Sequence, residues 1–356
     1  MKIGIFDPYL DTLGGGEKYM LVLAQVLSEK HDVCIFWDKK KEDEIKAGAM
    51  QRFGLNLNTI NFLDNIFSIK TPFLKRLWEL QKYDVIVYLS DGSIPFSLKK
   101  NLIIHFQFPV ERVKPSLLGR VKFLSVKQVI CNSKFTKSYI DKKFYIDSKI
   151  LYPPVDIMKN TTYKKENIIL HVGRFSLDTK GNNFKKQDFM IDVFKKIATK
   201  ITDWRFILII SVKKEDKEKI KSLRERAKGF PIEIIENPSN EKLWQMYQKA
   251  KIYWHASGFG ENLEKNPEKA EHFGIATAEA MGAGAVPVVI NAGGQPEIVM
   301  NGKNGFLWDT EEEFITRTKQ IISNNTLWQE FSKEGQQAVI KFNKERFCEE
   351  IKGIVE

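Results

Sequence analysis

Two glutamates, Glu271 and Glu279, stand eight residues apart around a helix start predicted at Gly274–Ile275. Carboxylates accept hydrogen bonds strongly, so they suit hydroxyl groups. Eight helical positions span about 12 Å, which is comparable to the reach from a sugar across a diphosphate to a ribose. The amides of the helix start would lie between the two carboxylates, where a diphosphate would bind. The alternative is a pair of surface glutamates, but the small residues Gly282–Ala285 that follow indicate tight packing.

A second candidate for anion binding is a run of three glycines near the start of the chain. Gly14, Gly15 and Gly16 separate a predicted strand, Lys2–Phe6, from a predicted helix, Glu17–Glu29. Consecutive glycines let backbone amides approach a ligand closely, and the helix start behind them favours an anion. The run is not a GxGxxG fingerprint, and the sequence contains no GxxxxGK[ST] loop. A phosphate site and a plain strand-to-helix turn both remain open.

Two histidines lie at the ends of predicted strands. His105 belongs to the strand predicted at Leu102–Phe106, and ligands of open α/β sheets bind beside such strand ends. The alternative for His105 is an imidazole whose hydrogen bonds are satisfied inside the core. His255 follows the strand predicted at Ile252–Trp254, and the sequence leaves its role open.

The side chains that bind metals are not spaced as ligands. The sequence has no DxD motif, and its nearest acidic cluster, Glu42–Glu44, is typical of a solvated helix face. The five histidines and three cysteines lack the spacing of a metal site. The cysteines are also far apart and odd in number, which excludes a disulfide framework and favours a reducing cytoplasm.

The elements that must position these residues alternate between strands and helices. A length of 356 residues suits two domains better than one core. Tyr152-Pro153-Pro154 interrupts the alternation, because two prolines restrict the backbone as in a stiff connector. We therefore predict two doubly wound α/β domains over 1–155 and 156–335, each with a parallel sheet, and closing helices over 336–356. The predicted strands are Lys2–Phe6, Val33–Trp37, Val85–Leu89, Leu102–Phe106, Val129–Cys131, Ile168–Val172, Phe206–Ile210, Ile232–Ile235, Ile252–Trp254 and Val286–Ile290.

The composition is that of a globular, water-soluble protein, with 43% hydrophobic and 28% charged residues. No apolar run approaches the ~18 residues that span a bilayer, and Asp7-Pro8 directly after the first strand argues against a signal peptide. The net charge is +11, and residues 1–155 carry 24 Lys and Arg against 16 Asp and Glu. The sequence has no zinc-finger spacing and no aromatic RNA-binding signature, so nucleic acid explains this charge less well than an anionic membrane or phosphorylated substrates.

Two basic segments of the first domain also carry large apolar residues, namely Ile69–Lys82 and Arg112–Lys127. Helices of this kind can lie in the interface of an anionic membrane. The alternative is a core-facing helix with a basic outer face. The sequence alone leaves both interpretations open.

The run Glu271–Glu279, with its continuation through Gly293–Val299, closely resembles family 4 glycosyltransferases. These are retaining, nucleotide-sugar-dependent enzymes of the GT-B fold, which has two facing Rossmann-like domains. Gly173–Phe175 followed by Lys185–Asp188 is similar to the basic pair of the family. The resemblance spans nearly the whole chain, and the other matching segments are the glycine loop, Asn132–Thr136 and Leu151–Asp156.

This resemblance implies a role for each candidate residue. Glu271 would hold hydroxyl groups of the donor sugar, and Glu279 would hold the ribose. Arg174 and Lys185 would neutralise the diphosphate, with Lys186 as the alternative one position along. Such cations would stabilise the charge that develops on a nucleoside diphosphate leaving group, and they would replace a metal ion. The resemblance also implies that His105 faces the donor sugar near the reaction centre and that the donor contacts Gly14, Gly15, Gly16, Phe273, Gly274 and Ile275.

The implied activity is transfer of a hexose from a UDP- or GDP-sugar to a glycan or lipid-linked acceptor, in the synthesis of a cell-surface polysaccharide or glycolipid. The family mechanism is front-face substitution, in which the leaving phosphate helps to remove the proton of the acceptor. The implied location is the cytoplasm, including the inner face of the membrane. A non-catalytic nucleotide-sugar-binding module, a sugar-nucleotide epimerase and a phosphorylase remain alternatives. The missing GxGxxG argues against a nicotinamide-dependent oxidoreductase.

Overall fold

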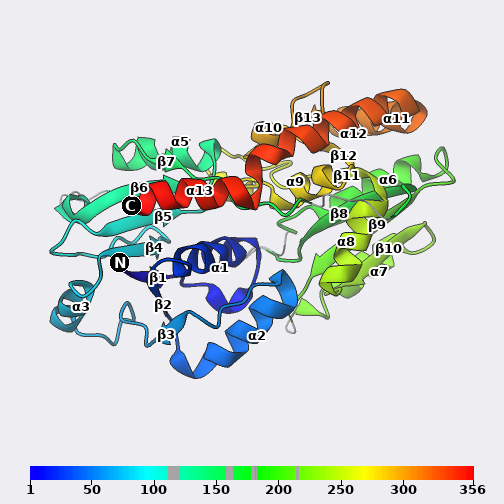
Figure 1. Cartoon of the computed structure of the whole chain (residues 1–356). Helices are drawn as coiled ribbons and strands as arrows, with labels where there is room; N and C mark the ends of the chain where they lie inside the picture. Colours follow the sequence, from blue (N-terminus) through cyan, green and yellow to red (C-terminus); the bar gives the residue numbers. More distant parts are fainter. Residues whose placement is uncertain (111–120, 158–162, 178–180, 182, 214–215) are drawn as a thin grey trace. The chain divides into compact units, whose positions relative to one another are not determined.

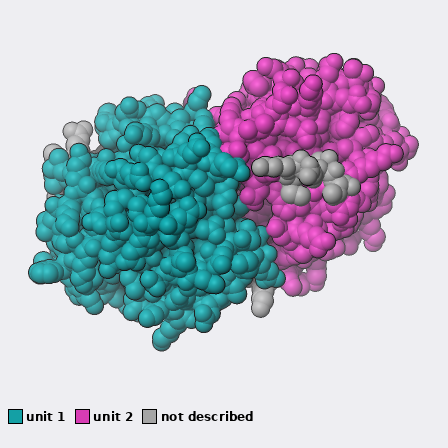
Figure 2. Space-filling view, viewed as in Figure 1, with its two compact units in different colours: residues 1–154, 344–356 teal, residues 155–343 magenta. Residues whose placement is uncertain are grey.

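The computed structural model describes residues 1–110, 121–157, 163–177, 181, 183–213 and 216–356. The chain forms two compact units (Figure 2). Unit 1 contains Met1–Pro154 and Lys344–Glu356, and unit 2 contains Val155–Asn343. Each unit is built on one parallel sheet with its own helices (Figure 1), which confirms the predicted doubly wound α/β architecture.

The sheet of unit 1 has seven strands in the order β3-β2-β1-β4-β5-β6-β7. Successive residues of a strand point to opposite faces of a sheet, and here both faces are buried. Val33 and Ile35 of β2 pack into one core cluster, while Cys34 and Phe36 pack into another. The strands are β1 (Lys2–Phe6), β2 (Asp32–Phe36), β3 (Asn61–Leu63), β4 (Val85–Leu89), β5 (Leu102–Phe106), β6 (Val126–Cys131) and β7 (Lys149–Ile150).

The last helix of the chain belongs to unit 1. Its side chains Phe347, Ile351 and Val355 are buried in the core cluster that also holds the apolar face of α1. The ring of Phe347 packs edge-on against Tyr19 of α1 at a centroid distance of 5.0 Å, and Lys127 Nζ donates to the carbonyl of Val355 at 2.6 Å. The α-helices of unit 1 are α1 (Gly15–Ser28), α2 (Glu42–Phe53), α3 (Phe73–Leu80), α5 (Lys134–Phe144) and α13 (Lys344–Val355).

The sheet of unit 2 has six strands in the order β10-β9-β8-β11-β12-β13. Strands β8 and β11 are neighbours in the middle of this sheet, and most of their residues are buried. The strands are β8 (Glu166–Arg174), β9 (Arg205–Ser211), β10 (Ile232–Glu236), β11 (Ala250–His255), β12 (Val286–Ile290) and β13 (Phe306–Trp308). The helices are α6 (Gln187–Ala198), α7 (Ile220–Ala227), α8 (Asn240–Lys249), α9 (Ile275–Gly282), α10 (Gln295–Ile298), α11 (Glu311–Ser323) and α12 (Asn325–Val339).

Helix α9 is anchored at its C-terminal end. Lys165 Nζ donates to the carbonyls of Ala250 and Ala283 at 2.8 and 2.7 Å, and Ser332 of α12 donates to the carbonyl of Gly284 at 2.8 Å. The carbonyls of Ala283 and Gly284 directly follow α9, whereas the carbonyl of Ala250 directly follows α8, so Lys165 ties the ends of these two helices together. Burial lowers the pKa of the Lys165 ammonium to about 7. These hydrogen bonds hold the C-terminal end of α9, and the sequence motif includes its N-terminal end.

Only one of the two predicted basic amphipathic segments lies wholly in the described part of the chain. Ile69–Lys82 contains α3, whereas residues 112–120 of the segment Arg112–Lys127 lie outside the described residues. Within the described residues, none of the helices combines the length and the apolar character that crossing a membrane requires.

Candidate active site

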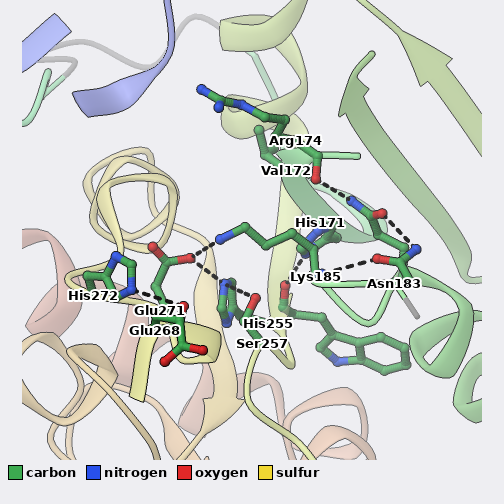
Figure 3. A network of polar contacts seen from close by, with 12 residues as sticks. His171, Val172, Arg174, Asn183, Lys185, His255, Ser257, Glu268, Glu271 and His272 are labelled. Atoms are coloured by element: carbon green, nitrogen blue, oxygen red, sulfur yellow. Dashed lines mark hydrogen bonds and ion pairs between the residues drawn. The ribbon is translucent and has the colours of Figure 1, made fainter. Parts of the chain in front are cut away.

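Two predicted site residues of unit 2, Arg174 and Glu271, lie at one edge of its sheet. Strand β8 ends at Arg174 and pairs in parallel with β11, which ends at His255. Since parallel strands end at the same edge, both residues lie where open α/β sheets bind ligands. The segment that leads into α9 brings Glu271 to the same place (Figure 3).

Lys185 is held by a loop that two amides organise. The Asn183 side chain accepts a hydrogen bond from the Lys185 backbone N–H at 3.1 Å and donates to the buried Gln187 side chain at 3.0 Å. Gln187 in turn donates to the carbonyl of Arg174 at 3.4 Å. Residue 186, just before α6, adopts the left-handed conformation with φ of 54°. This loop geometry sends the two consecutive lysines to different partners.

Lys185 reaches Glu271, and Lys186 does not. Lys185 Nζ lies 2.7 Å from Glu271 Oε2, although the two residues are 86 positions apart in the chain. Lys186 Nζ lies 2.6 Å from Glu261 Oε1, and Lys269 binds the other oxygen of Glu261 at 2.6 Å. The structure therefore separates the two lysines that the sequence offered as alternatives.

Glu271 has a second partner, His255. The Nε2 atom of His255 lies 2.9 Å from Glu271 Oε2, and the His255 side chain is almost fully buried. Burial raises the pKa of Glu271, but Lys185 and His255 outweigh burial and bring that pKa well below its usual range. Burial lowers the pKa of His255 despite the carboxylate beside it. We infer an ionised Glu271 that accepts from the ammonium of Lys185 and from a neutral imidazole.

Two glycines fix the backbone of Glu271. The Gly294 N–H donates to the carbonyl of Glu271 at 2.7 Å. A Cβ atom on Gly293 would lie 2.1 Å from that carbonyl oxygen, and a Cβ atom on Gly294 would lie 2.5 Å from the Cα atom of Phe273. Both distances are shorter than any real contact of a Cβ atom, so only glycine fits at 293 and 294 without movement of the backbone.

The start of α9 follows directly. Gly274 precedes the helix with φ of 115°, a conformation that favours glycine. Phe273 is buried with its ring edge-on to Phe342, and Ile275 is the first residue of the helix. Helix starts carry unpaired backbone N–H groups and a positive dipole end, which favour an anion.

Glu279 lies one residue beyond the middle of α9 and is 9% exposed. It accepts a hydrogen bond from the hydroxyl of Tyr247 at 3.2 Å. Tyr247 is fully buried on α8, and burial raises the pKa of its hydroxyl well above the usual range. Tyr247 therefore donates to Glu279 at any pH near neutrality, which orients the carboxylate.

Arg174 is exposed at the end of β8. In Figure 3 its side chain lies apart from the Lys185–Glu271 pair, so Arg174 and Lys185, the two cations predicted for the diphosphate, occupy different positions around the same strand end. The arrangement combines an ionised carboxylate, two cations and a helix start. These groups can bind hydroxyls and a diphosphate.

The glycine loop belongs to unit 1. Gly14 precedes α1, and its N–H donates to Glu17 Oε2 at 2.6 Å. A Cβ atom on Gly16 would lie 2.3 Å from Gln107 Oε1, and Gln107 donates to the carbonyl of Gly16 at 3.0 Å. Neither these two glycines nor Gly15 has a positive φ. Close packing against Gln107 thus accounts for Gly16, and the contact of this loop with a donor stays a prediction.

His105 is fully buried in unit 1 on β5. Its ring stacks on Tyr19 at a centroid distance of 4.4 Å, and its Nδ1 atom lies 3.4 Å from the carbonyl of Ile130. Burial lowers the pKa of His105 to about 3, so the imidazole is neutral near pH 7. No hydrogen-bond partner of its Nε2 atom is found among the described residues. Its place near a donor sugar stays a prediction.

Within the described residues, no three His, Cys, Asp or Glu side chains gather closely enough to hold a metal ion. We therefore name no candidate metal ligands in this part of the chain.

Comparison with known proteins identifies the family. A family model described as glycosyl transferases group 1 matches residues 155–338, which is more than half of the chain. The chain belongs to this family. The group 1 family corresponds to the family 4 glycosyltransferases that the sequence motifs resemble, so this resemblance is confirmed. The protein is a glycosyltransferase that uses a nucleotide sugar.

The relatives are distant but cover nearly the whole chain. A Dictyostelium discoideum protein named GDP-Man:Man(3)GlcNAc(2)-PP-Dol alpha-1,2-mannosyltransferase is 22% identical, over 98% of this chain and 83% of that protein. An uncharacterised glycosyltransferase of Haemophilus influenzae is 25% identical, over 99% of each chain.

Solved structures confirm the GT-B fold. Anabaena HepE in complex with UDP-glucose matches with a TM-score of 0.69 and 17% identity, over 99% of this chain and 98% of HepE. Sucrose-phosphate synthase of Thermosynechococcus elongatus matches with a TM-score of 0.70 and 14% identity, over 99% of this chain and 98% of that one. At this level of identity the likeness shows the fold of the glycosyltransferase and not its substrates.

Sequence reasoning assigned no role to two residues that hold the carboxylates. His255 binds Glu271 and Tyr247 binds Glu279. The signal for His255 was its place at the end of a predicted strand. Tyr247 had no such signal, because it lies on the buried side of α8 and its hydroxyl meets Glu279 only in the folded unit.

Proposed function

We propose that this glycosyltransferase binds the donor in unit 2, with Glu271 on the hydroxyl groups of a hexose and Lys185 on the diphosphate. One observation supports this assignment most directly, namely the contact of Lys185 with Glu271 at 2.7 Å. It sets an ammonium, which neutralises phosphate, beside a carboxylate, which accepts from hydroxyls. Sugar and diphosphate are adjacent in the same way in a nucleotide sugar, and the start of α9 offers backbone amides for the phosphate oxygens.

Arg174 is the second diphosphate cation in this proposal, and Glu279 is the acceptor for the ribose hydroxyls. During transfer, negative charge develops on the departing nucleoside diphosphate, and fixed cations stabilise it. We propose that Lys185 and Arg174 supply this stabilisation without a metal ion. Transfer would retain the anomeric configuration by front-face substitution, with the leaving phosphate taking the proton of the acceptor.

The donor would be a UDP- or GDP-hexose, and no further cofactor is required. Both nucleotides have support, since the Dictyostelium relative is named for GDP-mannose and HepE was solved with UDP-glucose. The acceptor would be a glycan or a lipid-linked saccharide of cell-surface polysaccharide or glycolipid synthesis, bound by residues 1–155. The place of action would be the cytoplasm and the inner face of the membrane.

The first experiment identifies the donor by a thermal-shift panel of UDP-, GDP-, dTDP- and ADP-sugars. Binding to the native state raises the melting temperature, by an amount that grows with the ratio of ligand concentration to Kd. The chosen donor is then incubated with and without candidate acceptors, and release of nucleoside diphosphate is followed together with the products. Donor binding without any release would indicate a binding module, and an isomerised donor without acceptor would indicate an epimerase.

The second experiment tests the assignment of Glu271. We expect Glu271→Gln to lower transfer at least ~100-fold, as for other lost electrostatic contacts in active sites. Glu261→Gln is the matched control, because Glu261 is also a carboxylate of unit 2 that pairs with a lysine from the same loop. Equal activity of the two variants would contradict the assignment.

A further inference from the structure

Helix α3 exposes apolar side chains that the core of unit 1 does not use. Leu74 and Trp78 lie one turn apart on the same face of the helix, and they are 73% and 76% exposed. Ile69, just before the helix, and Leu98, in the connection between β4 and β5, are also exposed. In Figure 1, α3 stands out from the sheet of unit 1.

Other residues of α3 face unit 1. Leu80 is fully buried in the core, and Leu77 and the 57% exposed Phe73 line a cavity of about 250 Å³ together with Phe67 and Phe96. Leu74 and Trp78 do not line that cavity. Their exposure therefore does not serve the packing of the helix onto the unit.

Four lysines belong to the same segments of the chain as these exposed apolar residues, namely Lys70, Lys75, Lys82 and Lys99. Lys70 and Lys75 are exposed and make no ion pair with any described residue. Lys82 neutralises Glu79, the acidic residue of α3, at 2.8 Å. Lys99 Nζ donates to the carbonyl of Gln81, which holds the connection between β4 and β5 against the end of the helix. Lys70 and Lys75 therefore leave an excess of positive charge on and beside α3.

We propose that α3, with Ile69, Leu98 and these lysines, is a docking surface for an anionic lipid bilayer. We call it the α3 surface. An amphipathic helix with Trp and Leu on one face and Lys beside them lies in the plane of the interface and buries its apolar face about 5–10 Å into the headgroup region. The lysines gain from the negative surface potential of the bilayer. A protein partner with an apolar groove would not by itself explain the flanking cations. The inference does not depend on which donor or acceptor the enzyme uses.

The experiment uses the whole chain and sedimentation with vesicles. Phosphatidylcholine vesicles are compared with vesicles that also contain phosphatidylglycerol. We expect binding to the anionic vesicles only, with an affinity that decreases as salt is added because salt screens surface charges. The proposal would be overturned if the protein bound both kinds of vesicle to the same extent, or if it bound neither.

Three variants locate the surface. Leu74→Ser with Trp78→Ser should weaken binding to anionic vesicles at least tenfold, and Lys70→Gln with Lys75→Gln should weaken it severalfold. Tyr145→Ser is the matched control, because Tyr145 is 77% exposed in the same unit but follows α5, which packs on β6 and β7. Unchanged binding of the Leu74/Trp78 variant would overturn the assignment.

Trp78 also offers a direct signal. It is largely exposed, whereas Trp254 and Trp308 are buried. The tryptophan emission of the wild type should therefore shift to shorter wavelength with anionic vesicles, and Trp78→Phe should still bind but lose most of the shift. Donor-induced thermal shifts, measured on the same variants, should be unchanged, which separates a failure of this proposal from a failure of the proposed function. A different outcome is that the wild type does not bind vesicles but self-associates, and that the Leu74/Trp78 variant does not self-associate. This outcome would assign α3 to a protein interface and overturn the proposal.

Discussion

The contact between Gly293 and the backbone of Glu271 gives the sharpest test of the candidate site. In Gly293→Ala, the new methyl group would lie 2.1 Å from the Glu271 carbonyl oxygen. Because Cβ atoms essentially never approach other atoms closer than 3.0 Å, the two segments must separate by about 0.9 Å. A displacement of about 1 Å in a reacting geometry costs up to about 100-fold in rate. We expect a loss of this order in donor turnover.

Gly302→Ala is the matched control for the cost of the backbone conformation. Both glycines have a positive φ, 64° at Gly293 and 76° at Gly302, but a Cβ atom on Gly302 would meet nothing within 4 Å. Alanine in this conformation costs about 1–2 kcal/mol, so Gly302→Ala should lose about 2 to 8 °C in Tm. Gly293→Ala should lose more, because its methyl group also meets the Glu271 carbonyl oxygen. Only Gly293→Ala should also lose turnover.

The assay is the initial rate of nucleoside diphosphate release from the donor that the thermal-shift panel identifies. Circular dichroism of each variant checks that it is folded before rates are compared. If Gly293→Ala turned over the donor as fast as Gly302→Ala, the backbone of Glu271 would not need its observed position, and the role given to Glu271 would be refuted.

Three further predictions concern single side chains. Lys185→Gln should lower transfer at least ~100-fold, whereas Lys186→Gln should lower it less than about tenfold, as measured by steady-state rates on the same donor. His255→Asn should raise KM for the donor and leave the melting temperature nearly unchanged, because His255 orients Glu271; unchanged kinetics would contradict this positioning role. Burial, together with nearby carboxylates, raises the pKa of Asp7 to about 8 from its ordinary 3.8, so the folded wild type holds a proton that the unfolded chain has lost between these pH values. The free energy of unfolding of the wild type should therefore decrease by up to about 1.4 kcal/mol per pH unit as pH rises through that window. Asp7→Asn does not titrate, so its free energy of unfolding relative to the wild type, measured by chemical denaturation, should increase from about pH 5 to about pH 8. A difference between the two proteins that is constant with pH would contradict the buried, protonated state of Asp7.

The strands of five or more residues were predictable, including the edge strand β10, and three shorter edge strands were not. Strands such as β5 and β12 are covered on both faces and consist of continuous apolar runs, which give a clear signal in the sequence. The strands that the prediction omitted are β3, β7 and β13, which have two or three residues each and lie at sheet edges. Strands this short contain too few residues for a periodic pattern to appear.

The motif of the candidate site could be read from the sequence, but its pairings could not. Glu271 and Lys185 were both named in advance, yet their contact joins positions 86 residues apart. Which of two consecutive lysines meets Glu271 depends on the hydrogen bonds of Asn183 within the loop. His255 joins them because β8 and β11 are neighbours in the sheet, and the sequence does not state which strands pair.

The position of α13 has a consequence for how the chain is made. The core of unit 1 contains Phe347 and Val355, so unit 1 lacks part of its interior until residues 344–356 leave the ribosome. Domains usually fold one after another during synthesis, but here unit 2 has all of its residues available before unit 1 does. A premature stop codon near position 344 would thus remove core residues from unit 1, whereas unit 2 would keep all of its residues.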